Sequence, residues 1–183
     1  MNKEKVHLHI STVKSTQDSG FKIAWDLYNE SFPLDERRSV VAQKEILKNP
    51  VYHFNLIYYN NTFIGFILWW QFSKLSYIEH FAISSNLRGQ GYGNLVLSQF
   101  AQNRSNTIIL EVEPPFSNIS KRRIHFYTTL GFKLSEENYM QPALNKNTQP
   151  VELLLMSYPQ ILSKNQIKYF MNHCHPLIYK TIE

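Results

Sequence analysis

The stretch RGQGYG, residues 88–93, decides how this sequence is read. The chain has six glycines, and three of them lie here: Gly89, Gly91 and Gly93. A predicted strand precedes the stretch and a predicted helix follows it. Glycine lets the backbone approach a ligand closely, and a helix N-terminus presents unpaired N–H groups with a partial positive charge. With Arg88 as an additional cation, the pattern predicts a site for a pyrophosphate.

Three kinds of phosphate-binding loop compete for this stretch. A Walker loop ends in Gly-Lys-Ser/Thr, whereas Gly93 is followed by Asn94 and Leu95. A dinucleotide fingerprint has the spacing G-x-G-x-x-G after the first strand of a parallel unit, and the spacing here is G-x-G-x-G. The third pattern, Arg/Gln-x-x-Gly-x-Gly/Ala, is matched by Arg88, Gly91 and Gly93.

Hydrophobic periodicity around this loop predicts the order of helices and strands. Strands are expected over residues 6–10, 52–59, 62–72, 75–83, 107–112, 132–134 and 151–157, with a polar loop between the last two. Helices are expected over residues 21–32, 39–47, 91–104 and 119–130, and in the tail from residue 163. Asn60-Asn61 is a candidate hairpin turn. This order predicts a mixed sheet covered by helices.

Composition restricts the class of protein. A chain of 183 residues predicts one domain, and we expect residues 159–183 to form a helical C-terminal extension of it. The net charge of +5 suits an anionic ligand, but the basic residues are dispersed, which argues against nucleic acid. Cys174 is the only cysteine, and the longest apolar run has eight residues, too short to span a bilayer. We therefore expect a cytoplasmic protein without a membrane partner.

Three segments together resemble the GNAT superfamily of acyl-CoA-dependent N-acetyltransferases. They are IEHFAISSNLRGQGYGNLVLSQF (78–100), IILEVE (108–113) and RRIHFYTTLGF (122–132). The resemblance covers roughly residues 20–157 and implies an α/β (α+β) fold. Its central sheet would be mixed and mostly antiparallel, with a splayed pair of parallel strands and flanking helices. It also implies transfer of an acetyl group from acetyl-CoA to a primary amine within a ternary complex.

The resemblance assigns coenzyme contacts residue by residue. The loop that it implies for the pyrophosphate consists of Arg88, Gly89, Gln90, Gly91, Tyr92, Gly93 and Asn94. The strand containing Phe81 and Ile83 is expected to pair with the pantetheine arm like an added strand, and N–H groups near Ile83 to polarise the thioester carbonyl. Lys121, Arg122 or Arg123 could reach the 3′-phosphate, or could form a solvated helix start.

The resemblance also assigns the proton transfers. Glu79 occupies the position of the general base, and Tyr127, in the motif FY-x-x-LGF, that of the general acid. Strand alternation places His80 on the face opposite Glu79, although a bulge would change this. Glu113 is the reserve candidate for the base. The chain departs from the family at Ser120, where many members have asparagine.

The acceptor is less well defined by the sequence. The loop SFPLDERRS (31–39) is expected to wall the amine site, and Asp35 and Glu36 could attract a cationic amine or simply favour a helix start. The predicted acceptor is a small-molecule or peptide amine, and a homodimer, common in the family, stays open. The tail sequence His173-Cys174-His175 has no matching ligand pair elsewhere, so we assign no metal. The alternative function is a CoA-binding sensor or partner-binding module that has lost catalysis.

Overall fold

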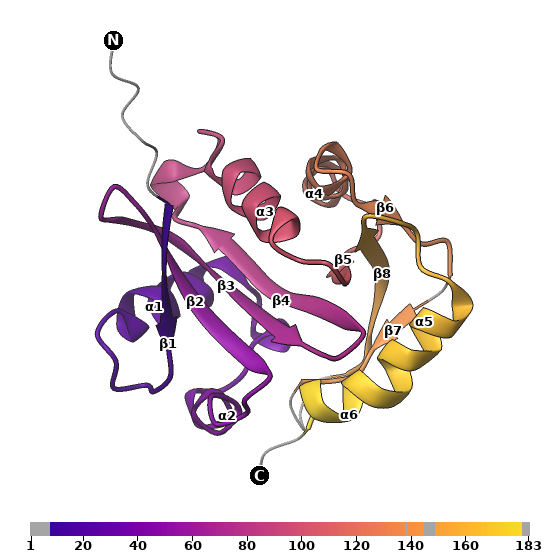
Figure 1. Cartoon of the computed structure of the whole chain (residues 1–183), viewed down its shortest axis with the longest axis horizontal. Coiled ribbons are helices and arrows are strands. Elements are labelled where there is room, and N and C mark those ends of the chain that lie inside the picture. Colours follow the sequence, from indigo (N-terminus) through magenta and orange to yellow (C-terminus); the bar gives the residue numbers. More distant parts are fainter. Residues whose placement is uncertain (1–7, 138, 145–148, 181–183) are drawn as a thin grey trace.

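A computed structural model describes residues 8–137, 139–144 and 149–180, and a single twisted sheet runs through them (Figure 1). Its strands are β1 (Leu8–Val13), β2 (Tyr52–Tyr59), β3 (Thr62–Gln71), β4 (Leu75–Ile83), β5 (Thr107–Val112), β6 (Lys133–Leu134), β7 (Tyr139–Gln141) and β8 (Val151–Tyr158). Their order is β1-β2-β3-β4-β5-β8-β6, and β7 pairs with β8 beside this path. Only the β4–β5 pair is parallel among these strands. The predicted mixed, mostly antiparallel sheet is confirmed.

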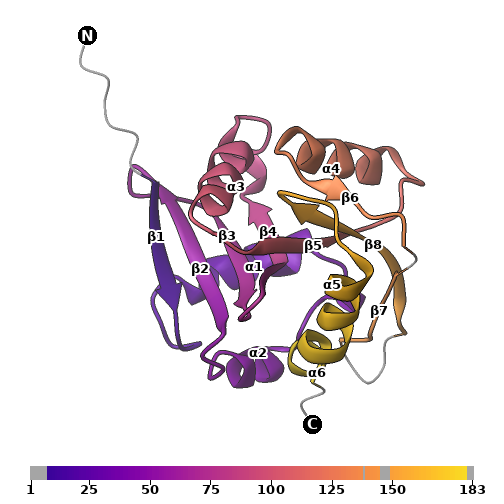
Figure 2. The ribbon, with the colours of Figure 1, turned by 45° about the vertical axis from the view of Figure 1, so that its right-hand side comes forward.

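Helices cover both faces of the sheet (Figure 2). They are α1 (Phe21–Ser31), α2 (Val40–Ile46), α3 (Tyr92–Gln102), α4 (Asn118–Thr129), α5 (Lys164–Tyr169) and α6 (His175–Ile178). A π-helical segment, Phe170–Cys174, joins α5 to α6, and the short 3-10 turns η1 (Leu34–Glu36) and η2 (Ser85–Leu87) lie in loops. The picture places α3 and α4 next to each other, and α5 and α6 beside β7 and β8.

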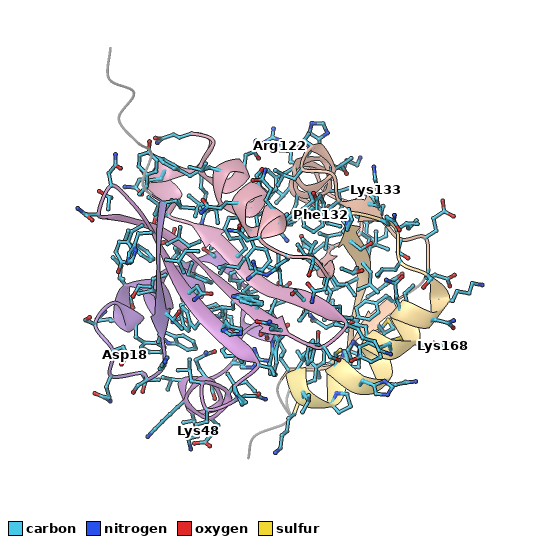
Figure 3. The ribbon with its side chains drawn as sticks, viewed as in Figure 1. Asp18, Lys48, Arg122, Phe132, Lys133 and Lys168 are labelled. Atoms are coloured by element: carbon cyan, nitrogen blue, oxygen red, sulfur yellow. The ribbon has the colours of Figure 1, made fainter. Side chains whose placement is uncertain are left out.

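The apolar side chains form two clusters, one on each face of the sheet. The first contains Ala24 and Tyr28 of α1 and Phe170 and Ile178 of the C-terminal segment. The second contains residues of α3 and α4, among them Tyr127. Side chains fill the space between the sheet and its helices on both faces (Figure 3). The C-terminal segment therefore belongs to the core of the first face.

Local sequence signals explain where several elements begin and turn. Asn60 and Asn61 both have left-handed backbones, with φ of 45° and 63°, as the tight hairpin turn between β2 and β3 requires. The Ser39 side chain accepts a hydrogen bond from the Ala42 N–H and caps α2. Ser120 forms a reciprocal capping box with Ser117 at the start of α4.

The parallel pair separates part of the way along its length. Strands β4 and β5 are paired from Leu75 with Thr107 to Ile78 with Leu110. Beyond Ile78, β4 continues to Ile83 and stays paired with β3 alone. The predicted splay is thus confirmed, and the edge of β4 that faces β5 is unpaired over its last five residues, 79–83.

A β-bulge lies at the start of this splay. On β3, Leu68 faces His80 and the next residue, Trp69, faces Ile78, so Glu79 is an extra residue on β4. The bulge turns both Glu79 and His80 towards the face covered by α1. The expectation that His80 lies on the face opposite Glu79 is therefore wrong, because strand alternation breaks at the inserted residue.

The remaining differences from the predicted elements concern their limits. The first strand covers residues 8–13 rather than 6–10, and residues 6 and 7 lie outside the described part of the chain. The segment expected to be a polar loop between residues 134 and 151 contains a short strand, β7, in which Tyr139 is buried. The strand forms because Tyr139 is buried against the sheet, which takes the backbone beside it away from water. Pairing with β8 then supplies hydrogen-bond partners to its N–H and C=O groups.

Candidate active site

A cavity of about 620 Å³ passes through the gap between β4 and β5. On the face of α3 and α4 it is lined by Leu110, Val112 and Tyr127, and on the face of α1 by Glu36, His80 and Glu111. The predicted site residues that line it are Glu79, Phe81, Ile83, Arg88, Gly89, Gly91, Gly93, Asn94 and Tyr127. The cavity thus joins the predicted coenzyme loop to the predicted acceptor side through the splayed sheet.

The N-terminus of α3 opens onto this cavity without a side-chain cap. The first N–H group of this turn with a backbone acceptor is that of Leu95, which donates to the Gly91 carbonyl at 3.1 Å. For the N–H groups of residues 89–94, no acceptor is found within the described chain. Gly91 has φ of 85°, and a Cβ built on it would meet no heavy atom within 4 Å. Unpaired donors beside open space form an anion-binding geometry.

The other residues of the loop hold its shape. Arg88 donates from Nε to the Ile83 carbonyl at 2.9 Å and from one terminal nitrogen to Ser31 Oγ at 3.1 Å. Gln90 and Tyr92 do not line the cavity: Gln90 donates to the Asn86 carbonyl, and the Tyr92 ring contacts the Tyr59 ring edge to face. A Cβ on Gly93 would lie 3.2 Å from the Phe126 ring, so this position fits a residue without a side chain.

Glu79 lies at the gap, and its carboxylate is fully engaged. One oxygen forms an ion pair with Arg38, and the other accepts a hydrogen bond from Trp70 Nε1 at 2.9 Å. The side chains of Glu79 and Arg38 are 3% and 4% exposed. Arg38 also donates to the Ile178 carbonyl at 2.6 Å, so it joins β4 to the C-terminal segment.

A second carboxylate, Glu111 on β5, lies on the same face and is held by uncharged donors. Its oxygens accept hydrogen bonds from Tyr77, Tyr139, Gln141 and Tyr179. Burial raises the pKa of the Glu111 carboxyl, and the hydrogen bonds of these donors oppose that rise. Tyr139 and Gln141 come from β7 and Tyr179 from the tail, so both segments hold the Glu111 carboxylate in place.

Tyr127 projects from α4 into the cavity from the opposite face. It is 9% exposed, and no hydrogen-bond partner of its hydroxyl is found among the described residues. Burial raises the pKa of Tyr127 to about 12, with a smaller opposing effect of Arg123. Tyr127 is therefore protonated at neutral pH, and its proton is available to a bound molecule.

His80 is a buried, neutral histidine beside the cavity. Its Nε2 lies 2.8 Å from the backbone oxygen of Glu36, and because a carbonyl only accepts hydrogen bonds, Nε2 carries the hydrogen. The rings of Tyr28 and Phe32 contact the imidazole edge to face. Burial and the charge of Arg38 lower the pKa of His80 to about 3. The bulge at Glu79 places this ring where it can support the loop that contains Glu36.

Two further carboxylates line the cavity, Glu113 and Glu36. Glu113 forms an ion pair with Arg123 at 2.9 Å. Arg123, a candidate ligand of the 3′-phosphate, therefore has an internal partner. Glu36, at the end of η1, is partly buried, and its carboxylate has no hydrogen-bond or ion-pair partner within the described part of the chain. Burial raises the pKa of the Glu36 carboxyl, and the charge of Glu113 raises it further, while Arg123 opposes this.

The structure brings together residues that the sequence did not connect. Arg38, Glu111 and Gln141 were not predicted as part of the site. An isolated acidic residue in the apolar strand TIILEV is a usable signal for Glu111, since an unpaired buried charge is costly. No sequence signal joins Arg38 to Glu79, which are 41 residues apart.

The histidines and the cysteine of the tail have separate environments. His173 is exposed and stacks on Tyr169, whereas Cys174 and His175 are buried. His175 lies 2.8 Å from the Tyr139 hydroxyl.

Within residues 8–137, 139–144 and 149–180, no group of three or more His, Cys, Asp or Glu side chains is arranged to hold a metal ion. In the same ranges, no helix has the length and apolar character needed to cross a bilayer.

Comparison with known proteins identifies the family that this fold and cavity belong to. The model of the acetyltransferase (GNAT) family matches residues 18–132, more than half of the chain. The chain therefore belongs to the GNAT acetyltransferase family. A protein from Bacteroides thetaiotaomicron described as a GNAT-family acetyltransferase is 31% identical in sequence, with a TM-score of 0.88. The alignment covers 95% of this chain and 99% of that one.

More distant solved structures share the fold. Naa50 from Arabidopsis thaliana, in complex with the bisubstrate analogue CoA-Ac-MVNAL, is 19% identical with a TM-score of 0.60, over 82% of this chain and 97% of that one. A GNAT acetyltransferase from Elizabethkingia anophelis with acetyl-CoA bound is 17% identical with a TM-score of 0.55, over 82% and 96%. Among curated protein sequences, none matches this chain.

Proposed function

We propose that this acetyltransferase moves the acetyl group of acetyl-CoA to a primary amine by direct attack in a ternary complex. The observation that carries the proposal is a continuous cavity through the splayed sheet. It has N–H donors at the start of α3, without an acceptor among the described residues, on one face and carboxylates on the other. A donor and an acceptor that enter from opposite faces would meet in the gap between β4 and β5.

The coenzyme half of the cavity has the chemistry that acetyl-CoA needs. The unpaired N–H groups of residues 89–94 suit the pyrophosphate, with the Arg88 guanidinium beside them. The unpaired edge of β4 around Phe81 and Ile83 suits the amide groups of the pantetheine arm, which can add to a sheet edge as a strand does. Both parts lead towards Tyr127, whose hydroxyl would protonate the departing thiolate.

The contacts of Glu79 bear on its predicted role as the base. A carboxylate paired with Arg38 and bonded to Trp70 is a weak proton acceptor, because protonation would break a buried ion pair. These contacts support a structural role, in which Glu79 and Arg38 tie the splayed end of β4 to the tail. Glu79 stays a candidate base only if the pair opens when substrate binds.

Relatives support an amine as the acceptor. The Arabidopsis Naa50 complex holds an analogue in which an acetyl group joins CoA to a peptide, and another structural relative is an aminoglycoside 6′-N-acetyltransferase in complex with coenzyme A. The partly buried carboxylate of Glu36 on the acceptor side suits an amine that arrives as an ammonium ion. Both a peptide N-terminus and a small amine fit this charge.

Two measurements test the proposal. Calorimetry with acetyl-CoA should show binding, and release of free CoA should be detected with at least one amine among spermidine, an N-blocked lysine peptide and a peptide with a free N-terminus. Binding without acetylation of any of these amines would favour the alternative, a CoA-binding sensor. No detectable binding at millimolar acetyl-CoA would overturn both.

A further inference from the structure

The carboxylate of Glu36 differs from the other carboxylates of the cavity because no partner for it is found among the described residues. Glu79 is paired with Arg38, Glu113 with Arg123, and Glu111 accepts four hydrogen bonds. Glu36 lines the same cavity, and the described residues supply no partner to its carboxylate. A group that must take a proton from a substrate needs an oxygen that no internal donor occupies.

The backbone that carries Glu36 is nevertheless fixed. Its carbonyl accepts the Nε2–H of His80 at 2.8 Å, and the turn η1 adds a hydrogen bond from the Glu36 N–H to the Pro33 carbonyl at 3.1 Å. His80 is 5% exposed and is held between the rings of Tyr28 and Phe32. A strand residue at the bulge of β4 therefore sets the position of an acceptor-side loop residue.

The charged groups around Glu36 come from the region of β5, from α4 and from the turn that carries Glu36 itself. Glu113 and Glu111 lie on or just beyond β5, Arg123 on α4, and Asp35 precedes Glu36 on its own turn. His80, from β4, is neutral at physiological pH. Burial is the largest cause that raises the pKa of Glu36, and Glu113, Glu111 and Asp35 act in the same direction against Arg123. A carboxylate with a raised pKa is a stronger base.

We propose that Glu36 is the general base that deprotonates the acceptor amine, and that His80 is the residue that positions it; this inference rests on the proposed acetyl transfer. The amine nitrogen forms a bond to the acetyl carbon while one N–H proton passes to a Glu36 oxygen, directly or through one water. The C–S bond breaks with its electron pair on sulfur, and the thiolate takes the Tyr127 proton. The products are the N-acetylated amine and CoA.

The test compares Glu36→Gln with two matched variants in an acetylation assay. Glu30→Gln removes an exposed carboxylate of α1 outside the cavity, and Glu79→Gln removes the other candidate base. The assay uses acetyl-CoA and whichever of spermidine, the lysine peptide and the free N-terminal peptide the wild-type protein acetylates. Rates are measured from pH 5 to pH 9, and acetyl-CoA affinity is measured by calorimetry for every variant.

We expect Glu36→Gln to lower kcat by about 100-fold or more, with unchanged acetyl-CoA affinity and with loss of the acid limb of the pH–rate profile. Glu30→Gln should retain the wild-type rate. Unchanged kcat and pH profile in Glu36→Gln, or a rise in the KM of the amine alone, would overturn the role of Glu36 as base and leave the transferase intact. A wild-type protein that acetylates none of the three amines would instead overturn the proposed function, and the inference with it.

Discussion

Arg38 and Glu79 form an ion pair whose two side chains are 4% and 3% exposed, between the bulge of β4 and the C-terminal segment. Arg38 comes from the loop before α2, and it donates to the Ile178 carbonyl as well. One guanidinium thus connects the predicted acceptor loop, the splayed strand and the tail. This pair accounts for how the cavity keeps its shape although two of its strands separate.

Breaking this pair should destabilise the protein strongly. Arg38→Met leaves the Glu79 carboxylate buried without a counter-ion, and we expect a loss of about 3–5 kcal/mol in the free energy of unfolding. The exposed pair between Lys22 and Asp26 is the control, and Lys22→Met should cost under about 1 kcal/mol. Denaturant titration measures both. A Glu79→Gln variant with wild-type stability and no activity would instead assign Glu79 a direct chemical role.

Tyr127→Phe should separate activity from stability. The hydroxyl has no partner among the described residues, so its removal should change the free energy of unfolding by under about 0.5 kcal/mol. Loss of the general acid should lower kcat by about 100-fold or more. Since burial raises the pKa of Tyr127 to about 12, this acid should stay protonated throughout an assay from pH 5 to pH 9.

Tyr139→Phe is the matched control for this prediction. Its hydroxyl donates to Glu111 and lies 2.8 Å from His175 Nε2, so the variant should lose stability by about 1–3 kcal/mol. Wild-type kcat in Tyr127→Phe would remove the general-acid role.

The position of Glu36 should depend on a hydrogen-bond donor at residue 80. His80→Leu cannot donate to the Glu36 carbonyl, and we expect a lower kcat and a shifted acid limb of the pH–rate profile, with little change in acetyl-CoA affinity. His80→Gln supplies an amide N–H on a side chain of similar length and should recover part of the rate. Equal pH profiles for the two variants would show that His80 only fills space.

Buried neutral histidines should make the protein sensitive to acid. Burial lowers the pKa of His80 to about 3 and that of His175 to about 4, below the ordinary value of 6.5. Between these values the unfolded chain binds protons that the folded chain does not, so stability is present above pH 6.5 and is lost as the pH falls towards 4.

The slope of this loss should reach about 1.4 kcal/mol per pH unit for each histidine. Denaturant titrations at pH 7 and pH 4.5 measure it. His175→Gln should reduce the slope, whereas His173→Gln, at an exposed neighbouring position, should leave it unchanged. Equal slopes for both variants and the wild type would contradict the assignment.

Gly65 provides a steric test of the close approach of β3 to the splayed end of β4. Gly65 of β3 faces Ile83 of β4, and a Cβ built on it would lie 2.2 Å from the Ala82 carbonyl oxygen. Backbone on both sides leaves little room to relax, so Gly65→Ala should cost several kcal/mol, on the order of other overpacked cores. Gly131→Ala is less informative because Gly131 has a φ of 91°, so its substitution would strain the backbone as well as approach the Tyr158 ring. A thermal melt shows whether Gly65→Ala folds at all.

Local signals in the sequence were sufficient for most of the fold. RGQGYG predicted the start of α3, and Asn60-Asn61 predicted the β2–β3 turn, because both depend on backbone conformations that few residues adopt. The bulge at Glu79 was not predictable, since it depends on how β3 and β4 align. It reverses the face of His80 and thereby changes which residues meet in the cavity.

The site was predicted unevenly for the same reason. The coenzyme loop is contiguous in sequence, and five of its seven residues line the cavity, as do Phe81 and Ile83 of the strand before it. The acceptor side is assembled from η1, the bulge of β4, β5, β7 and the tail, whose contacts span up to 140 residues, as between Arg38 and Ile178. Periodicity and motifs carry no information on such long-range contacts, so Glu36 was named while its role was left open.

The most direct test of the central claim is an NMR titration of the backbone amides with acetyl-CoA. We predict the largest ¹⁵N and ¹H shift changes at the N–H groups of residues 89–94, with smaller changes along Phe81–Ile83. S-acetylpantetheine, which lacks the pyrophosphate, should affect the strand and leave the loop unchanged. Acetyl-CoA that binds while the amides of residues 89–94 keep their shifts would contradict the account.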